Sequence, residues 1–486
     1  MKLFLFLASV LITCASFALP VALTQAESAA AAKLQTDGQQ ELRSISNCFP
    51  IESPAQSSTV AYVFELSPSG YIITSTDTNL PPVIAFSYTD NCRLPGDEGS
   101  ILIDMAARDL ETRMMNLTAL PNWYIGQNRE LWNEYTTGTF ELSAVDQWPP
   151  SGSTPTGGWL EENWTQSAPY NSYCPMDLIA GARSIAGCPA VAMGMIVNFQ
   201  ENTNSTRFND GDDYYHNYHE YYWIDDDYAA RDFPSWPELN SLLDTLDSLY
   251  ANQLPLSNLN KAALVYASGA ACKQVYTASA SGTFGVDQAY DGYIRFGYTG
   301  SELLFESSDS LYQRLAENMM NAMPAHLAII DSGPQYGHNV VVDGYNTDEF
   351  FHLNFGWGGS NNGWYQFPLT GMPYGMNIIE GLVLDIGSPV QSIEETSGTA
   401  GSTVALSVSN PVTSAMSINL SLPESCNATV SLYSLSGRLI QTIANSDFSQ
   451  GFHTISWYPG DIPGGIYFLR VSGVTFNETV KVTVIN

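Results

Sequence analysis

Residues 186–197 read Ala-Gly-Cys-Pro-Ala-Val-Ala-Met-Gly-Met-Ile-Val. The apolar run that follows Pro189 predicts a short buried helix, and Pro189 fits its first position, where a backbone N–H has no acceptor within the helix. Cys188 then lies at the helix N-terminus, whose partial positive charge favours the nucleophilic thiolate. Gly187 lets the backbone turn sharply and leaves room for a substrate. Cys188 is therefore a candidate nucleophile, and an inert or disulfide-bonded cysteine is the alternative.

A candidate base, His338, follows 150 residues after Cys188 and opens an apolar strand, residues 338–345. Residues 350–355 predict a second strand, so the two form a hairpin. Across it, Asn354 can hydrogen-bond the ring of His338 and fix its tautomer. Nucleophile, base and orienter in this arrangement predict acyl-transfer chemistry, whereas a lone histidine would be structural.

Gln166 lies 22 residues before Cys188 and can supply a further group. Its side-chain amide and the backbone N–H of Cys188 would be the two donors that hold an oxyanion. The alternative is an ordinary surface glutamine.

Composition excludes several classes of function. The 486 residues suffice for roughly three domains. They include 17 Lys and Arg against 49 Asp and Glu, a net charge of −32. The chain therefore lacks the basic surface that nucleic acids and anionic membranes require. Apolar residues at 44% and aromatic residues at 12% exclude disorder, which leaves an acidic, globular and extracellular protein.

The charge changes in steps along the chain. Residues 19–150 hold 16 acidic and 6 basic residues, residues 151–387 hold 27 and 7, and residues 404–486 hold 4 and 3. These steps support three modules. The central module carries −20, so its field is expected to draw basic or neutral polypeptides and to disfavour acidic ones.

The N-terminus has the pattern of a secretory signal. An apolar run from Leu3 to Ile12 is followed by small residues, with cleavage expected after Ala18. The run is too short to span a bilayer, and no later run is long enough, so no stable membrane insertion is expected. Lipidation of Cys14 is the alternative. Six cysteines remain after cleavage; export permits disulfides, and no CxxC pair is present.

Pro/Gly/Ser-rich linkers divide the rest of the chain. Before the first linker, residues 147–158, the chain shows little pattern at 19–45, a hairpin at 60–66 and 71–74, and a helix at 101–115. Helices are expected at 259–272 and 311–320 in the central block. The predicted segments are a signal peptide at 1–18, a first domain at 19–150, a central domain at 151–387, a linker at 388–403 and a small all-β sandwich at 404–486.

The central motifs together resemble the streptopain family of papain-like cysteine peptidases. They cover about residues 160–370 in the family's order and spacing. The matching residues are Trp164-Thr165-Gln166, Pro169-Tyr170-Asn171, Cys174-Pro175, Gly187-Cys188, Gly337-His338, Asp343-Gly344 and Asn354-Phe355-Gly356-Trp357-Gly358-Gly359. Pro189, Val191 and Phe355 depart from the usual family residues, but none of these changes removes a proton-transfer group.

This resemblance implies an α+β fold with a papain-like, two-subdomain core. It implies Cys188 as nucleophile, His338 as general base, Gln166 in the oxyanion hole and Asn354 as orienter. Trp357 would shield the His–Asn pair from water, or would simply be a core aromatic. The implied substrate-binding residues flank these groups or form a small-residue loop, namely Gly187, Gly337, Trp357, Ser279, Ala280, Ser281 and Gly282. No cofactor and no metal site are implied.

The flanking blocks carry resemblances of their own. Residues 62–87 resemble the family's inhibitory propiece, which implies a zymogen whose propiece covers the cleft until the linker at 140–158 is cut; a permanently attached domain is the alternative. Stretches such as Leu432-Tyr433-Ser434-Leu435-Ser436-Gly437-Arg438 resemble the sorting domain of the Por (type IX) secretion system. An adhesive Ig-like module is the alternative there.

The sequence thus predicts a cysteine endopeptidase made as a zymogen, exported through the periplasm and then secreted or kept at the cell surface. Its expected partners are polypeptide substrates, its own propeptide as inhibitor and the secretion machinery, without nucleic acid. Two other functions stay open, an adhesion protein on a degenerate protease scaffold and a related acyl-transfer enzyme.

Overall fold

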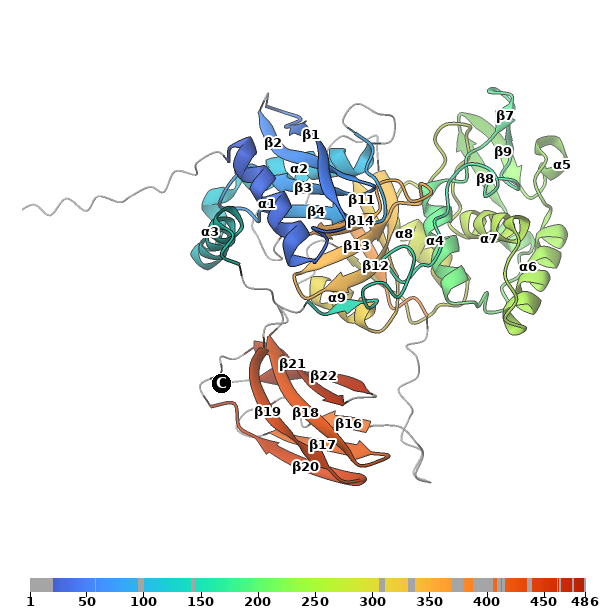
Figure 1. Ribbon diagram of the computed structural model, residues 1–486. Helices are drawn as coiled ribbons and strands as arrows, with labels where there is room; N and C mark the ends of the chain where they lie inside the picture. The colour runs from blue at the N-terminus through green and yellow to red at the C-terminus, as the bar shows by residue number, and fades with distance from the viewer. Residues whose placement is uncertain are drawn as a thin grey trace, which may run out of the picture. The chain divides into compact units, whose positions relative to one another are not determined.

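The computed structural model describes residues 21–484 with internal gaps. The gaps are residues 57, 95–99, 141–144, 306–310, 331–336, 369–378, 388–404, 409–411, 413–415, 435–438, 461, 463–464 and 474–475. The predicted signal peptide, the linker at 388–403 and parts of the tail motifs lie outside the described residues. Those that are described form two compact units (Figure 1). Within the described ranges, no helix has the length and apolar character needed to cross a membrane.

The first unit is an antiparallel sheet packed with helices. Its strands pair in chain order, β1 (Ser44–Glu52), β2 (Thr59–Ser67), β3 (Tyr71–Ser75) and β4 (Val83–Ser87). Its helices are α1 (Leu23–Thr36), α2 (Ile101–Met115) and α3 (Asn122–Thr137), with a short 3-10 helix at Leu117–Ala119. The β2–β3 hairpin and α2 confirm the predicted hairpin and helix.

Helix α1 lies within residues 19–45, where the sequence shows little pattern and predicted no element. Alanine has the highest helix propensity, and this segment is rich in it. Ala26, Ala29 and Ala30 are fully buried, because α1 packs on β2, β3 and α3. Alanines recur on several sides of the helix, so the apolar periodicity that marks an amphipathic helix is weak.

The second unit contains a larger antiparallel sheet in the order β14-β13-β12-β11-β15-β10, with β5 paired to the end of β12. The strands are β5 (Gln147–Trp148), β10 (Glu302–Phe305), β11 (Ala325–Ile330), β12 (Gly337–Asn346), β13 (Phe350–Asn354), β14 (Gly363–Gln366) and β15 (Ile379–Leu384). The β12–β13 hairpin confirms the two predicted strands. Its register pairs Val341 with Asn354.

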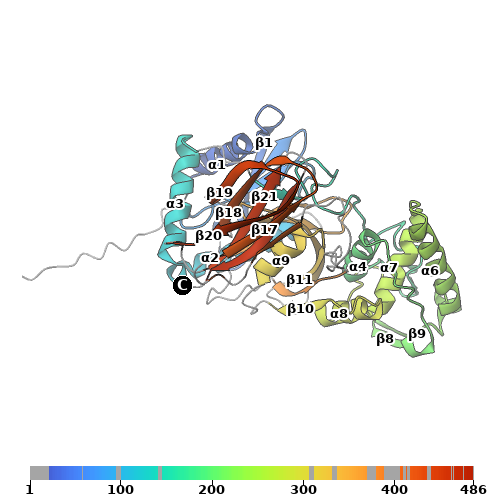
Figure 2. The ribbon, with the colours of Figure 1, turned by 90° about the horizontal axis from the view of Figure 1, so that it is seen from below.

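Helices and two small hairpins complete this part of the unit. The helices are α4 (Cys188–Phe199), α5 (Tyr228–Arg231), α6 (Trp236–Ala251), α7 (Asn258–Ala271), α8 (Val286–Arg295) and α9 (Leu311–Met320), with a 3-10 turn at Asp210–Asp212. The hairpins pair β6 (Met176–Asp177) with β7 (Ala182–Arg183) and β8 (Tyr214–Tyr218) with β9 (Glu220–Ile224). Helix α4 packs between α7 and the β11–β12 pair (Figures 1 and 2). The helical and sheet halves therefore meet at α4, as a two-subdomain core requires.

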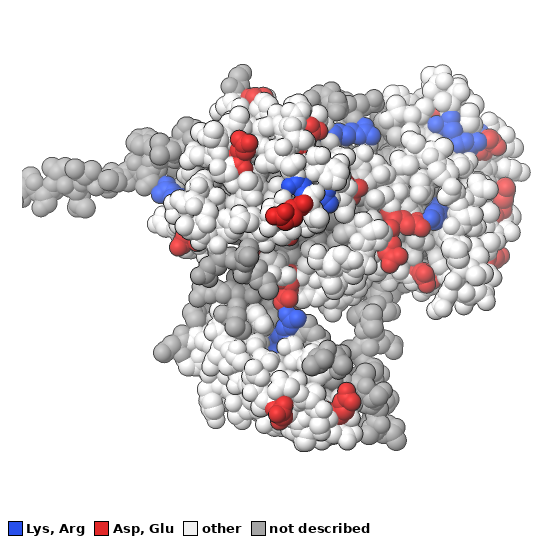
Figure 3. Space-filling model, viewed as in Figure 1, with Lys and Arg blue, Asp and Glu red and all other residues white. Residues whose placement is uncertain are grey.

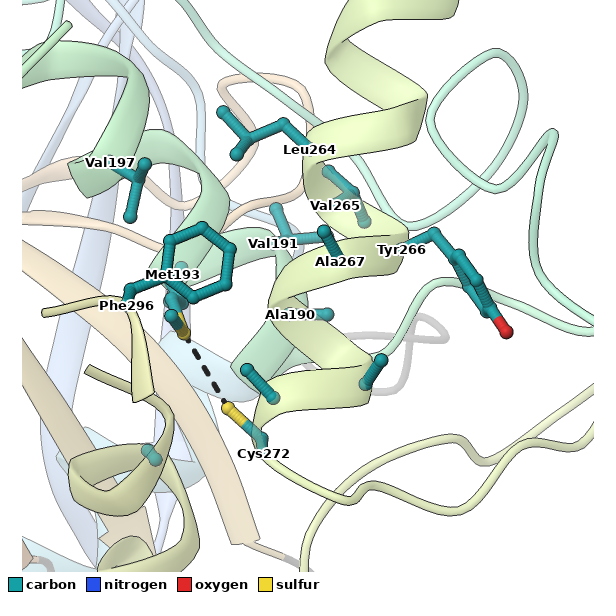
Figure 4. Packing of buried hydrophobic residues seen from close by; sticks show 14 of the residues in the cluster. Ala190, Val191, Met193, Val197, Leu264, Val265, Tyr266, Ala267, Cys272 and Phe296 are labelled. Atoms are coloured by element: carbon teal, nitrogen blue, oxygen red, sulfur yellow. Dashed lines mark hydrogen bonds between the residues drawn. The ribbon is translucent and has the colours of Figure 1, made fainter. Parts of the chain in front are cut away.

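Helix α4 is held by a continuous hydrophobic core. Figure 4 shows Ala190, Val191 and Met193 of α4 beside Val265 and Ala267 of α7, all of which are buried. The helix begins at Cys188, so the proline occupies its second position, one residue later than predicted. Because packing surrounds the helix, its N-terminus is fixed in space, as a reactive group requires.

Residues 405–484 form the all-β region that the sequence predicts. The described strands make two sheets, in the orders β16-β17-β20 and β19-β18-β21-β22. They are β16 (Ala405–Val408), β17 (Met416–Leu422), β18 (Cys426–Ser434), β19 (Leu439–Phe448), β20 (Gly451–Trp457), β21 (Gly465–Gly473) and β22 (Asn477–Val484). Alternate residues of β18, namely Ala428, Val430 and Leu432, are buried in a hydrophobic core of this region's own.

Candidate active site

Cys188 is the first residue of α4, and Gly187 is its N-cap. Gly187 has φ +84°, a conformation that side-chain-bearing residues rarely adopt, and a Cβ built on it would lie 2.7 Å from Oε1 of Gln274. This glycine therefore allows the chain to turn so that the thiol lies at the helix N-terminus. The backbone N–H of Cys188 has no acceptor within the helix, so it is available to a ligand.

His338 is buried on β12, and its side chain hydrogen-bonds the side chain of Cys188. Burial alone would raise the pKa of the Cys188 thiol, but the charge of His338 and hydrogen bonds from His338 and Asn339 outweigh it, so that this pKa is lowered. Burial also opposes the imidazolium, yet the Cys188 thiolate and a backbone bond to Phe355 raise the pKa of His338. The pair therefore favours a thiolate beside an imidazolium.

The other buried cysteines behave differently. Burial raises the pKa of the Cys48 thiol and raises those of Cys92, Cys174 and Cys272 to about 12. All six cysteines of the described residues are free thiols. Cys188 therefore combines a lowered thiol pKa with a histidine partner, which is the condition for a nucleophile.

The ring of His338 is oriented by the loop that follows β13. Its Nε2 lies 2.9 Å from the carbonyl oxygen of Phe355 and 3.1 Å from Nε1 of Trp357. A protonated Nε2 donates to the Phe355 carbonyl, whereas the indole N–H of Trp357 can donate only to a bare Nε2. Both contacts use Nε2, which leaves Nδ1 for the sulfur of Cys188.

The predicted hydrogen bond between Asn354 and His338 is wrong. The register of the hairpin places Asn354 opposite Val341, three residues along β12 from His338, or about 10 Å of extended strand. The Asn354 side chain instead accepts from the backbone N–H of Gly356 at 3.0 Å. It thus holds the loop whose carbonyl, at Phe355, contacts the ring.

Asn163, which the sequence did not single out, ties this loop to a second segment. Its Oδ1 accepts from Nδ2 of Asn354 at 3.2 Å and from Nδ2 of Asn362 at 2.8 Å. Asn362 in turn accepts from the backbone N–H of Phe355 at 2.9 Å. Three amide side chains therefore fix the peptide that orients His338. Asparagines in a loop give no sequence signal for such a network.

Gln166 lies on the same segment, close to the nucleophile. Its backbone carbonyl accepts from the N–H of Ala186 at 2.8 Å, two residues before Cys188. On the other side, the carbonyl of Trp164 accepts from the N–H of Gly358 at 2.8 Å. Residues 163–166 therefore connect the turn before Cys188 with the loop beside His338. The side chain of Gln166, at the end of this segment, is half-buried.

The loop of Ser279, Ala280, Ser281 and Gly282 also lies against the turn before α4. A Cβ built on Gly187 would lie 3.1 Å from the carbonyl oxygen of Ser281, and one built on Gly282 would lie 3.9 Å from Pro189. Ser279 and Ala280 are exposed, as is Gly337, and Trp357 is half-buried. The predicted binding residues therefore include surface that a polypeptide can reach.

Within the described residues, no group of three His, Cys, Asp or Glu side chains is placed to hold a metal ion. His216, for example, donates from Nδ1 to the carbonyl oxygen of Glu220 at 2.9 Å and accepts at Nε2 from the backbone N–H of Tyr276 at 2.7 Å. These contacts account for a buried structural histidine.

Replacing Asn354 by alanine is expected to lower kcat about 10- to 100-fold while KM changes little, since the side chain positions the Phe355 carbonyl and does not contact the ring. Steady-state peptide hydrolysis measures both constants. Asn318→Ala, which removes another buried amide of the same unit, bonded to Asp385 on a different part of the fold, is the matched control. A loss as large as that of a His338 variant would mean that Asn354 contacts the ring during turnover.

Comparison with known proteins agrees with this site. Residues 164–365 match the Peptidase C10 family, residues 18–101 match the Spi protease inhibitor, and residues 409–486 match a secretion system C-terminal sorting domain. The three matches follow one another along the chain in the order that the sequence predicts.

Individual relatives are distant. Streptopain from Streptococcus pyogenes is 23% identical over 330 residues, which cover 63% of this chain and 73% of that protein. Among solved structures, a prointerpain A fragment from Prevotella intermedia has a TM-score of 0.46 at 16% identity and covers 70% of this chain and 99% of that one. Active interpain A from the same organism has a TM-score of 0.35 at 21% identity, with coverage of 47% and 92%.

The family matches account for the three parts of the chain. The inhibitor match falls on the first unit, and the peptidase match contains Cys188, His338 and Asn354. The sorting domain directs its carrier to the cell surface or the extracellular space. The chain thus carries a region that matches the Peptidase C10 family between a Spi-type inhibitor region and a secretion sorting domain, which is the organisation of a secreted cysteine peptidase made as a zymogen.

Proposed function

We propose that the matured protein is an active endopeptidase in which Cys188 and His338 perform the chemistry. The observation that carries this proposal is the contact of a thiol at a helix N-terminus with a buried imidazole, together with their opposite pKa shifts. A lowered thiol pKa and a raised imidazole pKa make the nucleophile and the proton donor available together.

In the first half of the reaction, the Cys188 thiolate attacks the carbonyl carbon of a peptide bond. The backbone N–H of Cys188 and the side-chain amide of Gln166 donate hydrogen bonds to the resulting oxyanion. The intermediate collapses as the C–N bond breaks, and His338 gives its proton to the leaving amine. The products are a free amine and a thioester on Cys188.

In the second half, His338 is neutral and takes a proton from water. The hydroxide attacks the thioester carbon, the same donors hold the second oxyanion, and the C–S bond breaks. The carboxylic acid product leaves, and the site returns to a thiolate beside an imidazolium. The Phe355 carbonyl keeps Nε2 protonated whenever Nδ1 exchanges the reacting proton, which is the role that the sequence assigned to Asn354.

The substrate backbone is proposed to lie along the exposed part of the loop at Ser279 and Ala280, with Gly337 and Trp357 on the His338 side. This loop has small side chains and lies against the turn before Cys188, since a Cβ built on Gly187 would lie 3.1 Å from the carbonyl oxygen of Ser281. An extended polypeptide fits such a surface better than a compact ligand does.

Release of the propiece is proposed to follow cleavage at residues 150–153. These residues are exposed, whereas the flanking positions are held on the second unit. On one side β5 pairs with β12, and on the other the backbone N–H of Leu160 donates to Asp343 at 3.0 Å. Proteases cut exposed loop segments, so this stretch is open to cleavage.

Product analysis tests the proposed function. The matured protein is incubated with an unfolded polypeptide, and mass spectrometry reads the new chain ends. Internal cuts that disappear in Cys188→Ala support an endopeptidase. Incorporation of an added amine without net hydrolysis would instead show acyl transfer, and retention of the polypeptide without any new product would show a binding protein.

The acidic surface is expected to select substrates by charge. Residues 151–387 carry −20, and acidic side chains lie at several separate places on the face shown in Figure 3. At low salt, kcat/KM for a Lys-rich peptide should exceed that for a matched Glu-rich peptide about 3- to 10-fold, because the field draws cationic substrates. The ratio should approach one as salt shortens the Debye length. Equal rates at all salt concentrations would contradict this prediction.

A further inference from the structure

A second side chain from β12 reaches the sulfur of Cys188. Nδ2 of Asn339 lies 3.8 Å from Sγ of Cys188, within reach of an N–H···S hydrogen bond, and the backbone N–H of Asn339 also bonds this sulfur. Asn339 follows His338 directly on β12, and both side chains reach this sulfur. The thiolate therefore has the imidazole from one residue and an amide donor from the next.

The orientation of the Asn339 amide is set by a buried histidine on β11. Oδ1 of Asn339 lies 2.7 Å from Nε2 of His326. The amide oxygen can only accept, so Nε2 of His326 must carry a proton. With the oxygen held by His326, the NH₂ group of Asn339 must point to Cys188. A thiolate at Cys188 can only accept, so it requires the NH₂ group on its own side and selects the His326 tautomer that carries its proton on Nε2.

A tyrosine on α8 completes the chain of hydrogen bonds. The hydroxyl of Tyr293 lies 3.0 Å from Nδ1 of His326. A ring that donates from Nε2 and stays neutral must accept at Nδ1, so Tyr293 is the donor. Each link then donates in the direction of the sulfur, from Tyr293 to His326, from His326 to Asn339 and from Asn339 to Cys188. The aligned dipoles stabilise negative charge at the end of the chain.

The surroundings of His326 keep this chain in one protonation state. His326 and Tyr293 are both fully buried, and the neighbours of His326 across the sheet are Val341 on β12 and Val383 on β15. The ring contacts one titratable group through a printed bond, the hydroxyl of Tyr293, and Asn339 on the other side is not ionisable. Burial lowers the pKa of His326 to about 4, against the opposing bond to Asn339, and burial raises that of Tyr293. Both groups are therefore neutral near pH 7.

We propose that Asn339 is a catalytic residue that stabilises the Cys188 thiolate through its side-chain N–H, and that His326, backed by Tyr293, is the positioning residue that holds the amide in this orientation. Packing alone does not require these polar groups, since Val341, Ala328 and Met193 make the same layer apolar. Burying polar groups there is unfavourable unless they are bonded, and the chain of bonds satisfies them all.

The inference rests on the proposed function only for the identity of the nucleophile, and its test needs no substrate. The rate at which iodoacetamide alkylates Cys188 in the matured protein is followed against pH by peptide mass spectrometry. In Asn339→Ala the midpoint should move up by about one pH unit, since one hydrogen bond to the anion is lost. In Asn339→Asp, of equal size, it should move further, because a carboxylate replaces the donor. The order wild type, Ala, Asp is the expected signature.

Variants of His326 test the positioning role. His326→Phe should move the midpoint in the same direction but by less, and should add little in the double variant with Asn339→Ala. His326→Gln should restore most of the wild-type profile, because its amide can donate to Oδ1 of Asn339. His216→Phe, which removes a different buried histidine of the same unit, controls for lost stability and should leave the midpoint in place.

The possible results distinguish a failure of the role of Asn339 from a failure of Cys188 as the nucleophile. An unshifted midpoint in both Asn339 variants overturns the inference, and so does a His326→Phe shift that is matched by His216→Phe or is fully additive with Asn339→Ala. If the His326 variants do not fold, the two Asn339 variants still decide. Failure of the wild-type protein itself to be alkylated at Cys188 below the range of an ordinary thiol would contradict the proposed function instead.

Discussion

Cys188→Ala is expected to lower kcat/KM for peptide hydrolysis by at least about 10⁴-fold, because the atom that forms the thioester is gone. Substrate affinity should change little, since binding depends on the surrounding backbone and loops. The assay compares matured wild-type and variant proteins on one peptide. It also follows the precursor, because self-processing would stop in the variant whereas processing by an added protease would continue.

Cys272→Ala is the matched control for this prediction. Cys272 is a free thiol of the same unit, is buried beside Met193 at a sulfur–sulfur distance of 3.6 Å, and has its thiol pKa raised to about 12 by burial (Figure 4). Its loss removes a small buried group and should leave kcat within about twofold, with only a modest decrease in stability. Hydrolysis by Cys188→Ala at the level of this control would show that the nucleophile lies elsewhere.

His338→Ala is expected to reduce kcat/KM by about 10³- to 10⁴-fold and also to change the pH dependence of the thiol. In the wild type, the lowered pKa of Cys188 makes thiolate present below the ordinary thiol range, and the raised pKa of His338 keeps the imidazolium above the ordinary histidine range. Hydrolysis should therefore rise as the thiol ionises and fall as the imidazolium loses its proton. Without the imidazole, burial is left to raise the thiol pKa.

The rate of Cys188 alkylation against pH measures this change in the thiol pKa. The midpoint of that profile should move to higher pH in His338→Ala. His219→Ala, at an exposed turn between β8 and β9, is the control and should keep both the wild-type profile and the wild-type activity. A His338→Ala protein that is alkylated with an unchanged midpoint would mean that the imidazole does not set the ionisation of the thiol.

The main parts of the site could be predicted because their signals are local. A glycine, a cysteine and a proline ahead of an apolar run predict the start of a helix. A histidine at the beginning of an apolar stretch predicts that His338 lies at the start of a strand. The structure brings Cys188 and His338 into contact. It also places Gln166 near Cys188, because the backbone carbonyl of Gln166 accepts a hydrogen bond from Ala186, two residues before Cys188. Their roles in turnover remain the proposal that the variants above test.

Other parts could not be predicted because they depend on strand register. The sequence shows that residues 338–345 and 350–355 form a hairpin, but it does not show that Asn354 pairs with Val341. That offset decides that the Phe355 carbonyl, and not the Asn354 side chain, contacts His338. Similarly, His326 meets Asn339 only because β11 pairs with β12 in one register. Neither residue has a local pattern that indicates a partner.

If Cys188 is an activated nucleophile, it reacts with an electrophile ahead of the other thiols of the protein. The matured protein is treated near neutral pH with a limiting amount of an epoxide or iodoacetamide probe, and the modified peptides are identified by mass spectrometry. The account predicts a single adduct on Cys188, formed in parallel with loss of peptide hydrolysis, while the buried thiols of Cys92, Cys174 and Cys272 stay unmodified. Complete loss of activity with Cys188 unlabelled, or full labelling of Cys188 with activity retained, would contradict it.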